Sequence, residues 1–231
     1  MRRSLIISLA AAAAVLAGCS DSPSAPAASS NTPQTTQQAA AATTSAPATV
    51  PTQTKSGTGN DVVTLDTPVK VGILKFDCSQ CKGEVALKTD AAYDPDVLLL
   101  GKKAPYTGTH WLGMRGDTVT RMQIKASGPW TVTVGGLELA RIVPGTAPID
   151  GSGDDVLYLT KPAGAAQIVN KGSQYANFMV KVMTDGASGP DLAVNEQGGS
   201  YTGTVMFPAP GSENVQLVQI VSDGKWTITP K

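Results

Sequence analysis

The second half of the chain repeats the first, and this internal repeat constrains the fold more than any other feature of the sequence. The matching segments are residues 56–69 with 150–163, 85–101 with 180–196, and 119–133 with 215–229, at offsets of 94, 95 and 96. An offset that changes so little along the chain indicates two copies of one folding module. We place these copies at residues 56–143 and 150–231.

Each copy shows the alternation that is typical of antiparallel β-strands. In the first copy, Met122, Ile124 and Ala126 alternate with polar residues before a turn, and Trp130 and Val132 alternate with threonines after it. A period of two indicates strands with one buried face. In the second copy this turn contains Asp-Gly, which suits the positive φ angles of a two-residue type I′ hairpin. Further strands of the first copy are predicted at 61–66, 84–89, 97–101 and 106–112.

These short strands predict the fold class. Six or seven strands in about 85 residues, separated by Gly, Pro and Asp turns, favour a small antiparallel β-sandwich. The chain is therefore predicted to be an all-β protein with two such sandwiches in tandem. Residues that recur at equivalent places are interpreted as scaffold, and functional candidates are sought among residues present once. The recurring pairs are Trp130 and Trp226, Tyr106 and Tyr201, and Asp61 and Asp155.

The first 19 residues have the features of an export signal. Two arginines after Met1 precede an apolar run at 5–17, which is too short to span a bilayer as a permanent helix. The run ends in Leu-Ala-Gly-Cys at Cys19, which resembles the lipobox of bacterial lipoproteins. The resemblance implies that residues 1–18 are removed and that Cys19 carries a diacylglyceryl group, a stable anchor on the extracytoplasmic face of the cell membrane. The alternatives are an ordinary secretory signal or a short buried helix.

Residues 19–55 are predicted to form a disordered tether. Between 20 and 54 the chain is rich in Pro, Ser, Thr, Ala and Gln, and it carries one charged residue, Asp21. Such a segment buries too little apolar surface to offset the entropy of ordering its backbone. As a flexible coil, about 35 residues span roughly 30–35 Å. This length is enough to hold the modules away from a membrane surface.

Composition excludes several function classes. The chain has 18 basic and 18 acidic residues without a basic cluster, which argues against nucleic-acid binding. One histidine and three cysteines leave little material for a metal enzyme or a histidine-based triad, and no hydrolase, zinc-protease or P-loop motif is present. The glutamates, among them Glu84, Glu138, Glu196 and Glu213, show no spacing typical of an acid/base pair. We therefore expect a protein that is not an enzyme and has no cofactor.

Cys78 and Cys81 form a Cys-x-x-Cys pair between two predicted strands, and the second copy has no cysteine there. Outside the cytoplasm a disulfide bond between them is the expected state. A thioredoxin-like redox pair is an alternative, but it needs a helix after the first cysteine, and the flanking residues predict none. A zinc site with His110 as third ligand is a further alternative, although no second Cys-x-x-Cys supports it.

Two further segments are candidate ligand sites. The acidic loop 150–155 has some likeness to calcium-binding turns, but it lacks the carboxylate ladder of an EF-hand and is predicted to be a turn. Tyr93, His110 and Trp111 are aromatic or imidazole side chains outside the repeated set. Such rings can stack on sugars or anchor a protein interface, so these three residues are candidate ligand contacts. Ordinary packing is the alternative.

The repeated motifs resemble tandem β-sandwich modules of secreted and lipid-anchored actinobacterial proteins. They are Gly-x-Gly-x-Asp-Val, Pro-Asp-Leu, Tyr-x-Gly-Thr and Asp-Gly-x-Trp-Thr-Ile, and the resemblance covers residues 56–231. It implies a fold and a location but no activity. Our leading hypothesis is a non-enzymatic lipoprotein, anchored through Cys19, that binds or displays to an envelope protein or glycan. The alternatives are a carbohydrate-binding accessory lipoprotein and an envelope redox or metal protein using Cys78 and Cys81.

Overall fold

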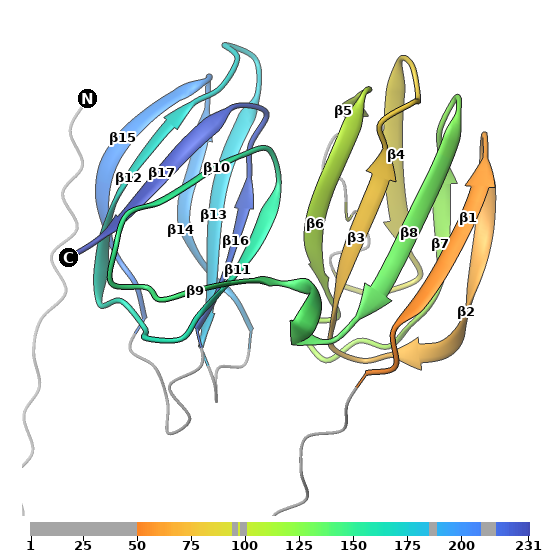
Figure 1. Cartoon of the computed structure of the whole chain (residues 1–231), viewed down its shortest axis with the longest axis horizontal. Helices are drawn as coiled ribbons and strands as arrows, with labels where there is room; N and C mark the ends of the chain where they lie inside the picture. Colours follow the sequence, from red (N-terminus) through yellow and green to blue (C-terminus); the bar gives the residue numbers. More distant parts are fainter. Residues whose placement is uncertain (1–49, 94–96, 98–100, 185–188, 209–215) are drawn as a thin grey trace, which may run out of the picture. The chain divides into compact units, whose positions relative to one another are not determined.

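The computed structural model describes residues 50–93, 97, 101–184, 189–208 and 216–231 (Figure 1). The predicted signal segment, Cys19 and most of the predicted tether lie outside the described residues. Within them the regular structure consists of strands and a 3-10 turn at Leu137–Leu139. No helix in this part of the chain is long and apolar enough to span a bilayer. The prediction of an all-β sandwich protein is confirmed.

Module 1 is a sandwich of two four-stranded sheets. The sheets have the orders β1-β8-β3-β6 and β2-β7-β4-β5, and every strand pair is antiparallel. The strands are β1 (Gln53–Thr58), β2 (Asp61–Val69), β3 (Gly72–Cys78), β4 (Glu84–Thr89), β5 (Lys102–Lys103), β6 (Tyr106–Leu112), β7 (Val119–Lys125) and β8 (Pro129–Gly135).

Module 2 repeats this topology strand for strand. Its sheets have the orders β10-β17-β12-β15 and β14-β13-β16-β11, to which β9 is added beside β11 as a parallel strand. Eight antiparallel strands in these two orders form a jelly roll. The strands are β9 (Arg141–Val143), β10 (Ile149–Ser152), β11 (Asp155–Leu159), β12 (Ala165–Lys171), β13 (Asn177–Thr184), β14 (Asp191–Gln197), β15 (Ser200–Met206), β16 (Gln216–Val221) and β17 (Lys225–Pro230).

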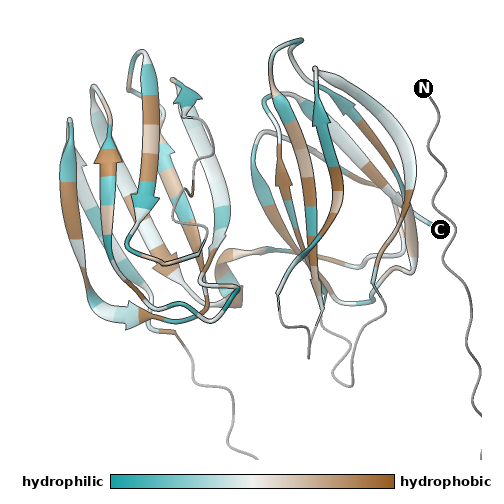
Figure 2. Cartoon of the chain, turned by 180° about the vertical axis from the view of Figure 1, so that it is seen from behind, coloured by the Kyte–Doolittle hydropathy of each residue, from teal (hydrophilic) through white to brown (hydrophobic). Residues whose placement is uncertain are grey.

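Each module has its own apolar core between its two sheets, and hydrophobic and hydrophilic residues alternate along the strands (Figure 2). Met122, Ile124 and Ala126 are buried, as are Trp130 and Val132 after the turn. The predicted one-sided burial of both strands is confirmed, but β7 and β8 lie in different sheets and do not pair, so the predicted hairpin between them is wrong. In module 2 the equivalent strand β16 is buried at all six positions. A second apolar neighbour must therefore cover its outer face.

The recurring tryptophans hold the same turn in each module. The indole Nε1 of Trp130 donates to the Gly59 carbonyl, and that of Trp226 donates to the Gly153 carbonyl, both at 2.9 Å. A Cβ atom at Gly151 would lie 2.1 Å from the Trp226 ring. The ring therefore occupies the space of the missing side chain, which supports the interpretation of these residues as scaffold.

Both ends of module 1 differ from the boundaries that the repeat predicts. Strand β1 begins at Gln53, and the buried Gln53 amide donates to the Thr67 carbonyl at 2.7 Å and accepts from the Asp66 N–H at 2.8 Å. Residues 53–55 therefore belong to the sandwich rather than to the tether. At the other end, β9 pairs with β11, so residues 141–143 belong to module 2. Gln53 lies opposite Val134, so the chain enters module 1 beside the point where it leaves.

Three local predictions are corrected. In the strand expected at 97–101, the Val97 N–H donates to the Leu87 carbonyl at 3.1 Å and 98–100 lie outside the described residues; the described strand here is Lys102–Lys103, after Gly101 with its φ of +70°. The second-copy turn is not a hairpin, because β16 and β17 lie in different sheets; three residues, 222–224, connect them, and Gly224 does not have a positive φ. Glycine is required there because a Cβ would lie 2.1 Å from the Lys171 carbonyl oxygen.

The third correction concerns the repeat alignment around β4. Leu87 lies opposite Ile124, and Val180 lies opposite the equivalent Ile220. Leu87 therefore corresponds to Val180, at an offset of 93 rather than 95, because the loops on either side of this strand differ in length between the copies. The same ladders make Lys102 the equivalent of Glu196.

Candidate functional site

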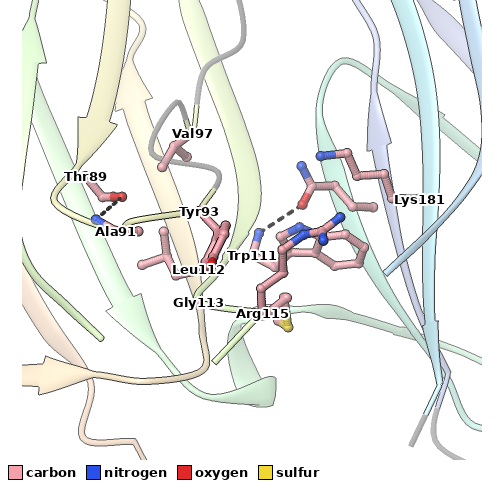
Figure 3. Close-up of a pocket in the computed structure, with 11 residues that line it drawn as sticks. Thr89, Ala91, Tyr93, Val97, Trp111, Leu112, Gly113, Arg115 and Lys181 are labelled. Atoms are coloured by element: carbon pink, nitrogen blue, oxygen red, sulfur yellow. Dashed lines mark hydrogen bonds between the residues drawn. The ribbon is translucent and has the colours of Figure 1, made fainter. Parts of the chain in front are cut away.

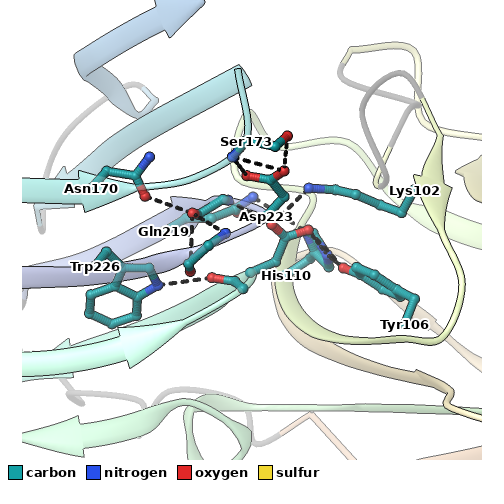
Figure 4. Close-up of polar contacts among 12 residues, drawn as sticks. Lys102, Tyr106, His110, Asn170, Ser173, Gln219, Asp223 and Trp226 are labelled. Carbon is teal, nitrogen blue, oxygen red and sulfur yellow. Dashed lines mark hydrogen bonds and ion pairs between the residues drawn. The ribbon is translucent and has the colours of Figure 1, made fainter. Parts of the chain in front are cut away.

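The two modules meet at one interface inside the compact unit Ser45–Lys231, and we call this interface the joint. Edge strand β6 of module 1 contacts β11 of module 2, and the Thr109 N–H donates to the Asp154 carbonyl at 3.2 Å. Six residues form a hydrogen-bonded group here, which we call the joint network (Figure 4). They are Lys102, Tyr106, His110, Asp154, Gln219 and Ser222.

Asp154 occupies the tight turn between β10 and β11. Gly153, with a φ of +71°, turns the chain so that the Asp154 carboxylate points inward. Its Oδ1 accepts the Ser222 N–H at 2.8 Å, as the Oδ1 of the equivalent Asn60 accepts the Ala126 N–H at 3.0 Å in module 1. Both modules therefore need a hydrogen-bond acceptor at this position. Module 1 uses the amide oxygen of Asn60, and module 2 uses the carboxylate of Asp154.

The charge of Asp154 is used across the joint. Its side chain is fully buried, and the Lys102 ammonium, with 14% of its side chain exposed, donates to Oδ1 at 2.9 Å. The Tyr106 hydroxyl donates to Oδ2 at 2.7 Å. Burial and the carboxylate together raise the pKa of Tyr106 well above 10.0, so it keeps its proton. Three donors thus offset the desolvation that an isolated buried carboxylate would suffer.

His110 continues the network as a neutral ring. Its Nε2 lies 2.6 Å from the Tyr106 oxygen, whose proton is already given to Asp154, so Nε2–H is the donor. Its Nδ1 lies 3.5 Å from Nε2 of Gln219 and accepts from that amide, while Oε1 of Gln219 accepts the Trp111 N–H at 3.2 Å. Burial lowers the pKa of His110 to about 4, against a raising effect of Asp154. The ring is therefore uncharged at neutral pH.

Apolar side chains from both modules surround this network and cover the outer face of β16. We call them the joint cluster: Ile73, Trp111, Met114, Ala140, Val156 and Leu217. The matching face of module 1, on β2 and β7, has a different character. Val62 replaces the buried Val156 and is 61% exposed, and Arg121 replaces Leu217. The two copies have therefore diverged so that one outer sheet face is apolar and the other is largely polar.

Among the three candidate ligand contacts, Tyr93 and Trp111 lie together and His110 does not. Tyr93, 65% exposed, and Trp111, 9% exposed, line a narrow crevice with Arg115 and Lys181 (Figure 3). The crevice has about 30 Å³ of room, enough for roughly two water molecules. His110 is 1% exposed and belongs to the joint network, so it cannot reach a ligand in solvent.

A wider hollow opens at the rim of the joint, next to Lys102. It has a volume of about 550 Å³, and its charged lining residues are Lys102, Lys103, Asp223 and Lys225. The Asp223 carboxylate accepts a hydrogen bond from the Ser173 N–H, at 3.0 Å to Oδ1. Lys102 is paired with Asp154, so Lys103 and Lys225 are the exposed cations of this hollow, and they favour contacts with anionic or polar groups.

The sulfurs of Cys78 and Cys81 lie at disulfide-bonding distance, with 5.2 Å between the Cα atoms. The predicted pairing is confirmed. Both residues are buried in the core of module 1, whereas a redox-active thiol must be open to its substrate. His110 lies in the joint network, and the described residues contain no group of three or more His, Cys, Asp or Glu side chains arranged to hold a metal.

The three carboxylates of the 150–155 loop point to different partners. Asp150 accepts from the Thr227 hydroxyl at 2.6 Å, Asp154 enters the joint network, and Asp155 pairs with Arg141 at 2.9 Å. Calcium needs several oxygens that converge on one point. Residues 150–152 belong to β10 and Asp155 begins β11, so the predicted turn into a strand is formed by residues 153–154.

Sequence reasoning missed Lys102, Asp154 and Gln219 as joint residues. The available signal was the exchange of Asn60 for Asp154 inside an otherwise matching turn. An added charge at a turn is ordinary for a solvent-exposed residue, so this signal alone did not indicate burial.

Comparisons with known proteins add no relative. No protein-family profile matches the sequence, and no curated protein matches it. Among solved structures, the stem and receptor binding domain of the spike protein P1 from bacteriophage PM2 aligns over 80% of each chain, with 8% identity and a TM-score of 0.14. That score is too low to support an inference about fold or function.

Proposed function

We propose that this chain is a non-enzymatic, lipid-anchored protein of the extracytoplasmic membrane face that binds or displays to an envelope protein or glycan. The observation that supports this best is the burial of the polar groups in the joint. Tyr106, His110 and Asp154 form the group most similar to a catalytic constellation, yet each is buried and bonded to the others. Catalysis requires these groups to reach a substrate. These three residues serve instead to fix one module to the other.

The proposed location is supported by the lipobox at Cys19, by the composition of the tether and by the buried disulfide. Disulfide bonds persist mainly in oxidising compartments outside the cytoplasm. Two acyl chains on Cys19 would hold the protein stably on the membrane.

Substitution of the proposed lipid acceptor tests the anchor. We expect the native protein to partition into detergent and its intact mass to include acyl groups, whereas a Cys19→Ser variant partitions into water. A native protein that partitions into water and carries no lipid mass would contradict the proposal.

The binding role is tested by cross-linking in intact cells, with variants in the hollow at the joint rim. Lys103→Glu and Lys225→Glu reverse two exposed charges there. A specific partner that is cross-linked by the native protein and lost in these variants supports binding at this hollow. Equal recovery with the variants would place the contact elsewhere.

A carbohydrate-binding role is the second candidate, and exposed Tyr93 beside the Trp111 crevice favours it. Trp111 itself is a poor test residue, because it packs in the joint cluster and its removal would disturb the fold. Tyr93→Ala is the sharper variant, with Tyr175→Ala as the control because Tyr175 is 91% exposed on another loop. Saturable binding to a glycan panel that only Tyr93→Ala abolishes would support this role. The redox or metal alternative has no comparable support, since both cysteines are buried and paired.

A further inference from the structure

The joint is formed by an edge strand of module 1 and an outer sheet face of module 2. The repeat gives each of these two surfaces a counterpart in the other module, and within the described part of the chain both counterparts are uncovered. In the joint, edge strand β6 of module 1 meets the outer face of β11 and β16 in module 2. The equivalent edge strand of module 2 is β15, at the end of its sheet. The equivalent outer face of module 1 is formed by β2 and β7. Among the described residues, no neighbouring strand covers either one.

Two exposed apolar side chains mark these uncovered surfaces. Met206 on β15 is 77% exposed, and Val62 on β2 is 61% exposed. Their repeat equivalents are Trp111 and Val156, and both of these belong to the joint cluster. The ladder registers confirm the equivalence of Trp111 and Met206, which lie opposite Ile73 and Ala165. Three residues further along the same strands, Phe76 and Ile168 lie opposite Val132 and Ile228, which the repeat matches. The chain thus exposes the counterparts of two residues that it buries in one cluster elsewhere.

Three of the six joint-network residues also have polar, uncharged counterparts, whereas Lys102 corresponds to Glu196, His110 to Val205 and Ser222 to Ala126. Asn60 stands for Asp154, Gln123 for Gln219 and Tyr201 for Tyr106. Oδ1 of Asn60 accepts the Ala126 N–H, so its amide N–H groups remain as donors for a tyrosine oxygen. The Tyr201 hydroxyl makes no hydrogen bond within the described residues.

The face of module 1 is also hollowed where a partner strand would lie. Two shallow hollows of about 350 Å³ each lie beside Val62 and Gln123. On this face Arg121 and Lys125 pair with Asp90 and Glu84 of the same module, whereas β14, next to β15 on the other side of module 2, carries Asp191 and Glu196. The repeated apolar positions, rather than net charge, therefore favour this contact.

We propose that the β14–β15 edge of module 2 binds the β2–β7 face of module 1 in a second copy of this chain. The contact repeats the joint between molecules. Because it joins two different surfaces, it is heterologous, and copies associate head to tail in an open series. It is weaker than the joint, because Arg121 replaces Leu217 and no ion pair replaces that of Lys102 with Asp154. Anchoring on a membrane would raise the effective concentration of the chains and favour it.

The first test uses blocked variants of the unit Ser45–Lys231 in sedimentation equilibrium. For the native unit we expect an average mass that rises continuously with concentration. Val62→Lys blocks one surface and Met206→Lys the other, so each variant stays monomeric alone, and a mixture of the two forms 1:1 dimers through the intact surfaces. Tyr175→Lys is the control and associates like the native unit. A native unit that stays monomeric at millimolar concentration, or a mass that levels off at the dimer, would overturn the proposal. A mixture without dimers would do the same.

The second test transplants the ion pair of the joint into the contact between molecules. Asn60→Asp supplies the equivalent of Asp154, and Glu196→Lys supplies the equivalent of Lys102. The double variant is expected to associate at least tenfold more tightly than the native unit, while neither single variant does. An equal effect of one substitution alone would show a contact of different geometry. Thermal melting of each variant verifies that the modules remain folded.

Discussion

At the residue scale, one exchange distinguishes the two equivalent turns: Asn60 lies in a surface turn of module 1, and Asp154 lies at the centre of the joint. Asn60 and Asp154 perform the same local task, accepting an N–H from the residue that follows β7 or β16. The second oxygen of Asp154 extends this task by accepting the Tyr106 hydroxyl from the other module. The same turn therefore acquires a role between modules through a single change of side chain.

Removal of this carboxylate should be far more costly than removal of its counterpart. Asp154→Ala leaves the Lys102 ammonium and the Tyr106 hydroxyl buried without their acceptor, so we expect a loss of about 3–5 kcal/mol in the free energy of unfolding. Asn60→Ala loses one hydrogen bond at an exposed turn, worth about 1 kcal/mol. Urea denaturation of the two variants measures both. Equal losses would show that the charge contributes nothing to the joint.

His110 should make stability depend on pH. Its native pKa of about 4 lies below the value of 6.5 for an unperturbed histidine, so the unfolded chain takes up the proton first. The contribution is complete above pH 6.5 and is lost as the pH falls towards 4, by about 3 kcal/mol. A protonated Nδ1 would also face the Gln219 amide donor, which is held in place by its bond to Trp111.

The pH prediction is tested by comparing the native protein with His110→Gln. Asp154, Lys102 and Lys181 also act on this ring, and they are present in both proteins. The difference in unfolding free energy between the two proteins, followed from pH 7 to pH 4.5, therefore isolates the histidine. Parallel pH profiles would show that its burial has no effect on its titration.

At the element scale, β10 depends on the glycine beneath the Trp226 ring. Gly151→Ala would place a methyl group 2.1 Å from ring atoms, so we expect a loss of about 1–3 kcal/mol from the strained packing. Gly164→Ala is the matched control in the same module, because it has open space around its Cβ position and its φ is not in the left-handed region. Thermal melting distinguishes them, and equal melting temperatures would mean that the ring moves aside without cost.

The elements show what could be predicted from sequence and what could not. Strands with alternating burial, such as β7, were predicted because periodicity reports one buried face. Strand β16 carries Leu217 and Gln219 on its other face, and they contact a module that is distant in sequence. Periodicity reports local exposure and cannot identify that neighbour. The same reason explains why His110 was a candidate ligand contact and proved to be a buried joint residue.

At the scale of the whole molecule, the joint should make two sandwiches unfold as one. A module of about 85 residues is marginal alone, because it buries a smaller fraction of its surface than a larger domain does. The joint cluster adds apolar burial that neither module has by itself. Calorimetry of the unit Ser45–Lys231 is therefore expected to show a single transition.

Leu217→Arg tests this coupling by giving module 2 the residue that module 1 carries at the equivalent place. The charged side chain cannot remain in the joint cluster, so the modules should separate and melt in two transitions, both at or below the native temperature. One unchanged transition in this variant would mean that the modules are coupled by other contacts.

The pairing of Gln53 with Val134 has a mechanical consequence. A force that pulls the chain before Gln53 away from the chain after Gly135 would act on neighbouring ends of β1 and β8. It would open their ladder one hydrogen bond after another. Such a geometry resists load poorly compared with strands pulled lengthwise past each other. The buried ion pair of Lys102 with Asp154 also joins the two modules. It therefore carries part of the load past the segment between β8 and β9. Under such a load, the first part of the molecule to give way would be β1, while module 2 stays folded.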